Sequence, residues 1–291
     1  MVDTEKKALI KKVFAQIYIW LLLLLMYAPI FVLIVFSFTD TDVLGQWNGF
    51  TFSLYVKLFQ SAEIMKAVGN TLIIALVSSA IATILGTLGA IGVHESRKYA
   101  KRTMEFANQI PVVTPEIVIA LSLTVMFVFF REHLFPDFQF SFWTLLAGHL
   151  VLSTPFVYLN VRPKLEQMDP ALYEAALDLG CTPTKALLRT TLPEIGPGVV
   201  SGFLIAITLS LDDFIVTAFT AGPGLLSGVS KISTISTYVQ GVIKKHPLPP
   251  ELRALCTIIF LVVLLVVLSL IFINSRQNKR NGRHAKARMK L

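Results

Sequence analysis

The chain has 291 residues, of which 54% are hydrophobic and only 15% are charged, and its formal net charge is +8. Soluble domains carry about 25% charged residues, so this composition excludes an ordinary soluble enzyme and indicates a multi-pass membrane protein. The basic residues cluster at the ends of apolar runs, where they set topology and contact anionic lipid, and no motif for nucleic-acid binding accompanies them.

Six apolar runs are each long enough to cross a bilayer as a helix, which takes about 20 residues. Helices are expected because lipid offers no partner for unpaired backbone groups, and because the runs lack the alternation of barrel strands. The predicted spans are residues 14–36, 68–93, 110–130, 142–161, 198–219 and 254–273. The expected fold is therefore an all-α membrane protein with six transmembrane helices, forming one domain over residues 1–291. In the second span, Gly86, Gly89 and Gly92 recur every three residues and predict a face that another helix approaches closely.

The Lys and Arg residues gather on one side of the predicted membrane. Of the 26 basic residues, 19 lie in the N-terminal tail (1–13), the connections 94–105 and 162–196, and the basic C-terminal tail (274–291). Basic residues favour the cytosolic side, so both termini are predicted to be cytosolic. Four more basic residues in connection 220–253 weaken this signal without reversing it.

Cysteine and histidine give no sign of a metal or redox site. Cys181 and Cys256 fall in a predicted cytosolic segment and in a predicted span, so neither a disulfide nor a metal framework is expected. The histidines lack metal-ligand spacing, and His149, in the fourth span, is expected to pack or to line a cavity. We predict no catalytic residue and no metal site.

The connection between the fourth and fifth spans carries strong local helix signals. Asp169 followed by Pro170 is an N-cap with proline at the first helical position, and Gly180 suits a left-handed helix end. Pro183 repeats the start signal, and the second helix is expected to end before Pro193, because the residue before a proline disfavours helical geometry. The segment is therefore expected to form a compact knob of two short helices.

The same connection contains "EAALDLG" and, nine residues later, "TTLP", a pattern that resembles the EAA loop of ABC importer permeases. The matching positions are Glu174, Ala175, Ala176, Gly180, Leu192 and Pro193. Thr190 departs from the isoleucine usual in that family. The resemblance implies a type I ABC importer permease fold, in which the loop over residues 169–193 is a coupling helix that docks on a separate ATP-binding subunit. The chain has no glycine-rich loop with Lys-Ser/Thr to cradle phosphate, so ATP and Mg²⁺ are expected on that partner and not here.

Three further stretches, "SFTDTDVLGQWNGFTFSLYVKLF", "VTPEIVIALSL" and "LSLDDFIVTAFTAGPG", are similar to the second membrane subunit of spermidine/putrescine permeases. This resemblance covers roughly residues 27–273. It implies polyamine import across the cytoplasmic membrane. It also implies a homologous second permease subunit, two copies of an ATP-binding subunit and an extracytoplasmic polyamine-binding protein as partners.

Acidic residues inside the spans support the same substrate class. Glu116, Asp212 and Asp213 lie in the predicted third and fifth spans, and no Lys or Arg lies in spans three to five to pair with them. Each such charge costs about 2.5–3.5 kcal/mol at the membrane centre, so it usually faces a cavity. A path lined by these carboxylates suits a cation with several ammonium groups. Neighbours on a helix are about 100° apart, so we expect one aspartate to face the path and the other to cap or pair with a helix; Glu116 is alternatively a helix N-terminal acid near the interface.

Two other functions are compatible with parts of this pattern. One is an ABC importer for another cationic or small solute, for example ferric ion. The other is an ion-coupled secondary transporter, which predicts inverted repeats and broken helices. Neither feature is visible in the sequence, and that transporter leaves the EAA-like loop without a role.

Overall fold

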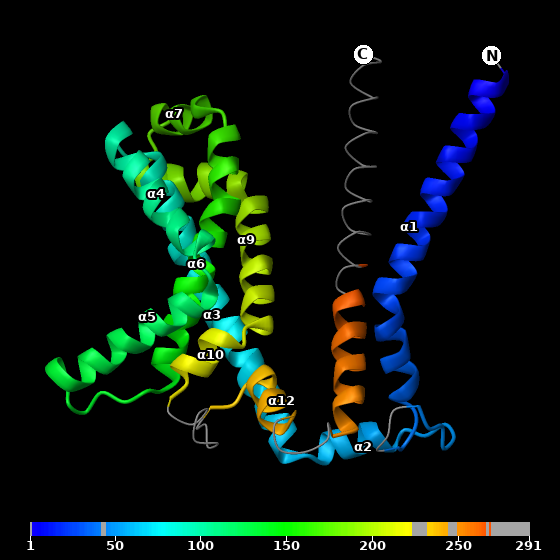
Figure 1. The fold of residues 1–291 in the computed structure, drawn as a ribbon. Coiled ribbons are helices and arrows are strands. Elements are labelled where there is room, and N and C mark those ends of the chain that lie inside the picture. The colour runs from blue at the N-terminus through cyan, green and yellow to red at the C-terminus, as the bar shows by residue number, and fades with distance from the viewer. Residues whose placement is uncertain (1, 42–44, 223–231, 244–248, 266–267, 269–291) are drawn as a thin grey trace. The chain divides into compact units, whose positions relative to one another are not determined.

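The computed structural model describes residues 2–41, 45–222, 232–243, 249–265 and 268, with side chains from residue 11 onward (Figure 1). The chain divides into two compact units, Met1–Ala62 with Pro247–Leu291, and Glu63–His246, and each is described by itself. All regular elements among the described residues are helices. Five stretches are long and apolar enough to cross a membrane: Lys11–Phe36, Ala62–His94, Glu116–Leu134, Phe142–Gln167 and Pro183–Asp212.

The predicted sixth span, 254–273, is only partly described. Residues 251–265 are helical, and the remainder of that span lies outside the described residues except residue 268. The predicted basic tail, 274–291, also lies outside them.

The first unit consists of α1 (Val2–Phe36), α2 (Ser53–Gln60) and the helix over residues 251–265. Side-chain hydrogen bonds fix the connection between α1 and α2. Arg253, which is buried, donates from Nη1 to the carbonyl oxygen of Thr41 at 2.9 Å. Lys57 Nζ lies 2.9 Å from Asp40 Oδ2, and this hydrogen bond lowers the pKa of Asp40 below its ordinary value. Arg253 is one of the four basic residues in connection 220–253 that weaken the predicted orientation, and this contact gives it a structural role.

The second unit contains the rest of the described helices. In chain order they are α3 (Ala62–His94), α4 (Lys98–Val113), α5 (Glu116–Phe129) with the π-helical turn η1 (Phe130–Leu134), α6 (Phe142–Gln167), α7 (Pro170–Asp178), α8 (Pro183–Ala186) with the π-helical turn η2 (Leu187–Thr191), α9 (Leu192–Asp212), α10 (Ile215–Thr220) and α12 (Ile235–Ile243). Figure 1 shows α6 and α9 side by side, with α7 at one end of the pair and α10 at the other.

Val157 of α6 lies at the centre of the second unit and is fully buried. It packs between two glycines: a Cβ added to Gly86 of α3 would lie 2.7 Å from Val157 Cβ, and one added to Gly202 of α9 would lie 3.1 Å from Val157 Cα. The close approach that the glycine spacing predicts therefore exists at Gly86. At Gly89 and Gly92 no heavy atom lies within 4 Å of an added Cβ, because positions three residues apart drift around the helix.

The third and fifth spans differ from their predicted bounds. The predicted third span began at residue 110, but α4 ends at Val113, Thr114 and Pro115 are extended, and α5 begins only at Glu116. The cause is Pro115, which keeps the residue before it out of helical geometry. The predicted fifth span ran unbroken over 198–219, but the helix ends at Asp212 and a new one begins at Ile215.

Candidate functional site

The loop between α6 and α9 is built as local capping rules require. Asp169 Oδ1 accepts a hydrogen bond from the Ala171 amide at 3.0 Å, which caps α7. At the other end Gly180 has φ +83°, its amide donates to the Leu177 carbonyl, and the Cys181 amide donates to the Ala176 carbonyl. This pair of hydrogen bonds is the Schellman motif, in which glycine takes the left-handed position.

The EAA-like positions divide by exposure. Glu174, Ala175, Gly180 and Pro193 are exposed, whereas Ala176 is half-buried. Leu192, also half-buried, packs against the core around Val157 and Ile195. Leu179, at the C-terminal end of α7, is 86% exposed, an unusual environment for a leucine. Glu174 and Leu179 thus place a charge and a large apolar side chain on the surface of this loop.

The second helix of this loop does not end before Pro193, as the sequence predicted. Instead α8 continues through the π-helical turn η2 into α9, and Pro193 lies in the first turn of α9. Within this continuous helix Pro193 removes one backbone hydrogen bond, and the wider π turn just before it changes the register and accommodates the missing N–H. As a result, the loop is joined by continuous helix to the membrane span that follows.

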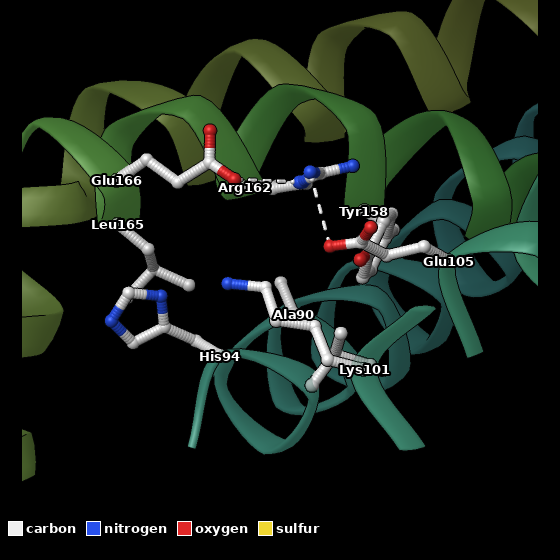
Figure 2. Close-up of a pocket in the computed structure, with 9 residues that line it drawn as sticks. Ala90, His94, Lys101, Glu105, Tyr158, Arg162, Leu165 and Glu166 are labelled. Carbon is white, nitrogen blue, oxygen red and sulfur yellow. Dashed lines mark hydrogen bonds and ion pairs between the residues drawn. The ribbon is translucent and has the colours of Figure 1, made fainter. Parts of the chain in front are cut away.

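An ion-pair cluster ties α4 to α6 near the same loop (Figure 2). Arg162 of α6 lies 3.0 Å from Glu105 of α4 and 2.8 Å from Glu166, one turn further along α6. One planar guanidinium therefore holds two helices together a few residues before α6 leads into α7.

The predicted acidic residues meet at the break between α9 and α10. Asp213 is buried, with 1% of its side chain exposed, and its carboxylate caps α10: Oδ1 accepts from the Val216 amide at 3.1 Å and Oδ2 from the Thr217 amide at 2.8 Å. The Thr217 hydroxyl also donates to Oδ2 at 2.8 Å. This side-chain cap competes with continued helix and explains the break that apolarity alone did not reveal.

Asp212 and Glu116 have the opposite environment. Both are exposed, and neither carboxylate forms a hydrogen bond or ion pair with a residue in the described part of the chain. Glu116, at the first position of α5, nevertheless interacts electrostatically with both aspartates. The packing of α5 on α10, including a hydrogen bond from Thr124 to the Phe219 carbonyl at 3.2 Å, brings these helices together. Glu116 thus lies within electrostatic range of Asp212 and Asp213, although almost 100 residues separate it from them in the sequence.

Sequence reasoning missed how His149 takes part in this region. It is fully buried in α6, with Nε2 at 3.0 Å from Thr217 Oγ1 and Nδ1 at 2.9 Å from Ser210 Oγ. Ser78 of α3 extends the network, 3.1 Å from Ser210 Oγ. The sequence did contain a signal: Ser210 and Thr217 flank the acidic pair, and one histidine lies in another span. Only the packing of three helices shows that these side chains meet.

Comparisons with known proteins agree with this architecture. Residues 82–281 match the family described as "Binding-protein-dependent transport system inner membrane component". The chain is 33% identical over 235 residues to the putrescine transport system permease protein PotI of Escherichia coli (strain K12), covering 80% of this chain and 81% of that protein. It is 32% identical over 257 residues to the spermidine/putrescine transport system permease protein PotC of Shigella flexneri, covering 88% and 92%. Its fold matches a chain in the crystal structure of a bacterial ABC transporter involved in the import of the acidic polysaccharide alginate, with a TM-score of 0.69, 21% identity, and 94% and 97% of the two chains covered.

The fold and the spans define an all-α, multi-pass membrane protein with the architecture of an ABC importer permease. The chain belongs to the family of binding-protein-dependent transport system inner membrane components. It is accordingly a translocation subunit of the inner membrane rather than an enzyme, and it works with a binding protein.

Proposed function

We propose that this chain is a permease subunit of an ATP-driven importer that carries polyamines, such as putrescine and spermidine, across the cytoplasmic membrane into the cell. The observation that carries the proposal is the meeting of Glu116, Asp212 and Asp213 at one helix break. Glu116 and Asp212 are exposed and available to ammonium groups, while the buried carboxylate of Asp213 adds its negative charge to the same region. A linear polycation neutralises such carboxylates one after another, whereas an anionic solute is repelled.

The relatives support the same substrate class. PotI is named for putrescine and PotC for spermidine and putrescine, and both align with most of this chain. The alginate transporter shares the fold at lower identity, and fold alone does not determine the transported solute. The acidic break therefore supports a cationic rather than an anionic cargo.

The division of labour in the complex follows from the loop around α7. We infer that the exposed Glu174 and Leu179 dock on an ATP-binding subunit, which supplies ATP and Mg²⁺. The assembly is completed by a homologous second permease subunit, two copies of the ATP-binding subunit and an extracytoplasmic polyamine-binding protein, with both termini of this chain in the cytosol. Because η2 joins the loop to α9, movement of α7 is passed to the helix that carries Asp212.

Transport by the complete importer in proteoliposomes tests the proposal. Labelled putrescine and spermidine are offered with the binding protein outside and ATP inside, and sulfate, ferric ion and alginate oligosaccharide serve as competitors. We expect uptake that requires both ATP and the binding protein and that only polyamines inhibit. Uptake of ferric ion in place of polyamine would favour the other cationic importer, and uptake driven by an ion gradient without ATP would contradict the proposal.

A further inference from the structure

His149 connects the two sides of the break between α9 and α10. Its ring reaches Ser210, three residues before Asp213, through Nδ1 and Thr217, four residues after Asp213, through Nε2. Both hydroxyls are buried, and so is the ring. A single side chain from α6 thus holds α9 and α10 at the point where their backbone hydrogen bonding is interrupted.

The hydrogen-bond directions in this network follow from the carboxylate of Asp213. Oδ2 is an acceptor, so the Thr217 hydroxyl donates its only hydrogen to it. Thr217 Oγ1 must then accept from His149, which requires a proton on Nε2. In the neutral ring Nδ1 is then the acceptor for the Ser210 hydroxyl, whose oxygen lies 3.1 Å from that of Ser78.

The neutral ring suits this site. His149 is fully buried, so its ring contacts neither water nor lipid headgroups. Asp213 Oδ2 lies 3.7 Å from Nε2, which is beyond hydrogen-bond distance. A buried imidazolium without a hydrogen-bonded counter-ion is costly, whereas the neutral ring has one donor and one acceptor, each with a partner.

The same network sets the direction of Asp212. Residues two apart on a helix point about 200° apart, so burying Ser210 against His149 turns Asp212 to the opposite, exposed side of α9. Asp213 is held in place by its cap on α10. The backbone on both sides of Asp212 is therefore fixed by groups that do not touch the exposed carboxylate.

We propose that His149 is a positioning residue for transport: as the neutral tautomer protonated at Nε2, it holds the α9–α10 break and so keeps Asp212 directed toward the substrate. The positioning role rests on the proposed function of Asp212 as a polyamine contact. The protonation pattern does not, because it follows from the hydrogen bonds and from the burial of the ring.

Solid-state NMR on the complete importer in lipid tests the protonation pattern. Histidine labelled with ¹⁵N is placed in this chain only, and His149 is assigned by subtracting the spectrum of the His149→Gln variant. At neutral pH we expect a protonated Nε2 and an unprotonated Nδ1. A proton on Nδ1, alone or together with one on Nε2, would overturn the inference even if the importer carries polyamines.

Transport by matched variants tests the positioning role. We expect His149→Leu to lower polyamine uptake at least about fivefold, because it removes two hydrogen bonds and the loss of one of average strength is worth about fivefold. His149→Gln should regain much of the rate, because its side-chain amide donates to Thr217. The control is Thr208→Val, which removes an exposed α9 hydroxyl that bonds only the Leu204 carbonyl, and it should transport normally.

The outcomes separate this inference from the proposed function. Normal uptake in His149→Leu, or a loss that His149→Gln does not relieve, would overturn the positioning role. If His149→Leu does not assemble, Thr217→Val removes the same contact from the other side and should lower uptake to a similar extent. If the wild-type importer carries no polyamine, the proposed function is wrong, and the NMR result still decides the protonation pattern.

Discussion

Asp212 and Asp213 are neighbours in the chain, but the carboxylate of Asp212 is exposed while that of Asp213 is buried and caps α10. One helix break therefore assigns two different environments to one acidic pair. Asp213 accepts three hydrogen bonds and stabilises the break, and Asp212 keeps its oxygens available. Substitutions at the two positions should affect different measurements.

Asp213→Ala should destabilise the protein. It leaves the Val216 and Thr217 amides and the Thr217 hydroxyl without their acceptor, and loss of a helix cap alone costs about 0.5–2 kcal/mol. A thermal unfolding midpoint measured on the purified chain in detergent checks this, with Thr208→Val as the control. An unfolding midpoint equal to that of the wild type would show that the cap contributes no stability.

Gly86→Ala and Gly89→Ala form a matched pair in α3. A Cβ at position 86 would lie 2.7 Å from Val157 Cβ and 3.0 Å from the Thr154 carbonyl oxygen, and overpacking of this kind costs about 1–3 kcal/mol. A Cβ at position 89 meets nothing within 4 Å, so Gly89→Ala should be neutral or slightly stabilising. Unfolding midpoints of the two variants compare them directly. Equal midpoints for the two glycine variants would contradict the packing described for Val157.

Gly180→Ala should weaken coupling between ATP hydrolysis and transport. Gly180 has φ +83°, and a side chain in left-handed geometry costs about 1–2 kcal/mol, which frays the end of α7. The ratio of polyamine transported to ATP hydrolysed in proteoliposomes is the measurement. Gly196→Ala is the control, because Gly196 lies in α9 with no heavy atom within 4 Å of an added Cβ. An unchanged ratio in Gly180→Ala would show that the Schellman motif is not needed for coupling.

Glu174→Lys should prevent assembly with the ATP-binding subunit or uncouple hydrolysis from uptake, because it reverses an exposed charge on α7. Glu174→Gln removes the charge without reversing it and should have a smaller effect. Co-purification of the ATP-binding subunit and polyamine uptake are the two measurements. Normal values of both in Glu174→Lys would count against docking through this face.

The ends of α7 could be predicted from the sequence because capping is local. Asp169 with Pro170 at one end and Gly180 at the other act through hydrogen bonds that span only a few residues. The membrane class was equally accessible, because the apolar runs and their length determine it. The prediction that a helix ends before Pro193 was wrong, because the effect of a proline on the backbone depends on whether the preceding helix ends or widens into a π turn.

The position of the break at Asp213 could not be predicted from hydropathy, for a physical reason. Residues 214–219 are as apolar as the helix before them, so hydropathy continues smoothly through the break. An aspartate in an apolar run is itself a capping residue type, and Thr217 four residues on was a usable signal. The role of His149 depends on α6 packing between two other segments, which no local pattern contains.

The most direct test of this account is polyamine uptake by the complete importer carrying Asp212→Asn, measured beside Asp213→Asn and the wild type. Asn at position 212 removes the exposed negative charge and leaves the buried network intact, so we predict that uptake falls at least tenfold while the unfolding midpoint stays unchanged. Asp213→Asn should lower the unfolding midpoint as well, because an amide NH₂ would replace an oxygen that accepts hydrogen bonds. Wild-type uptake in Asp212→Asn would contradict the central claim that this carboxylate contacts the polyamine on its way across the membrane.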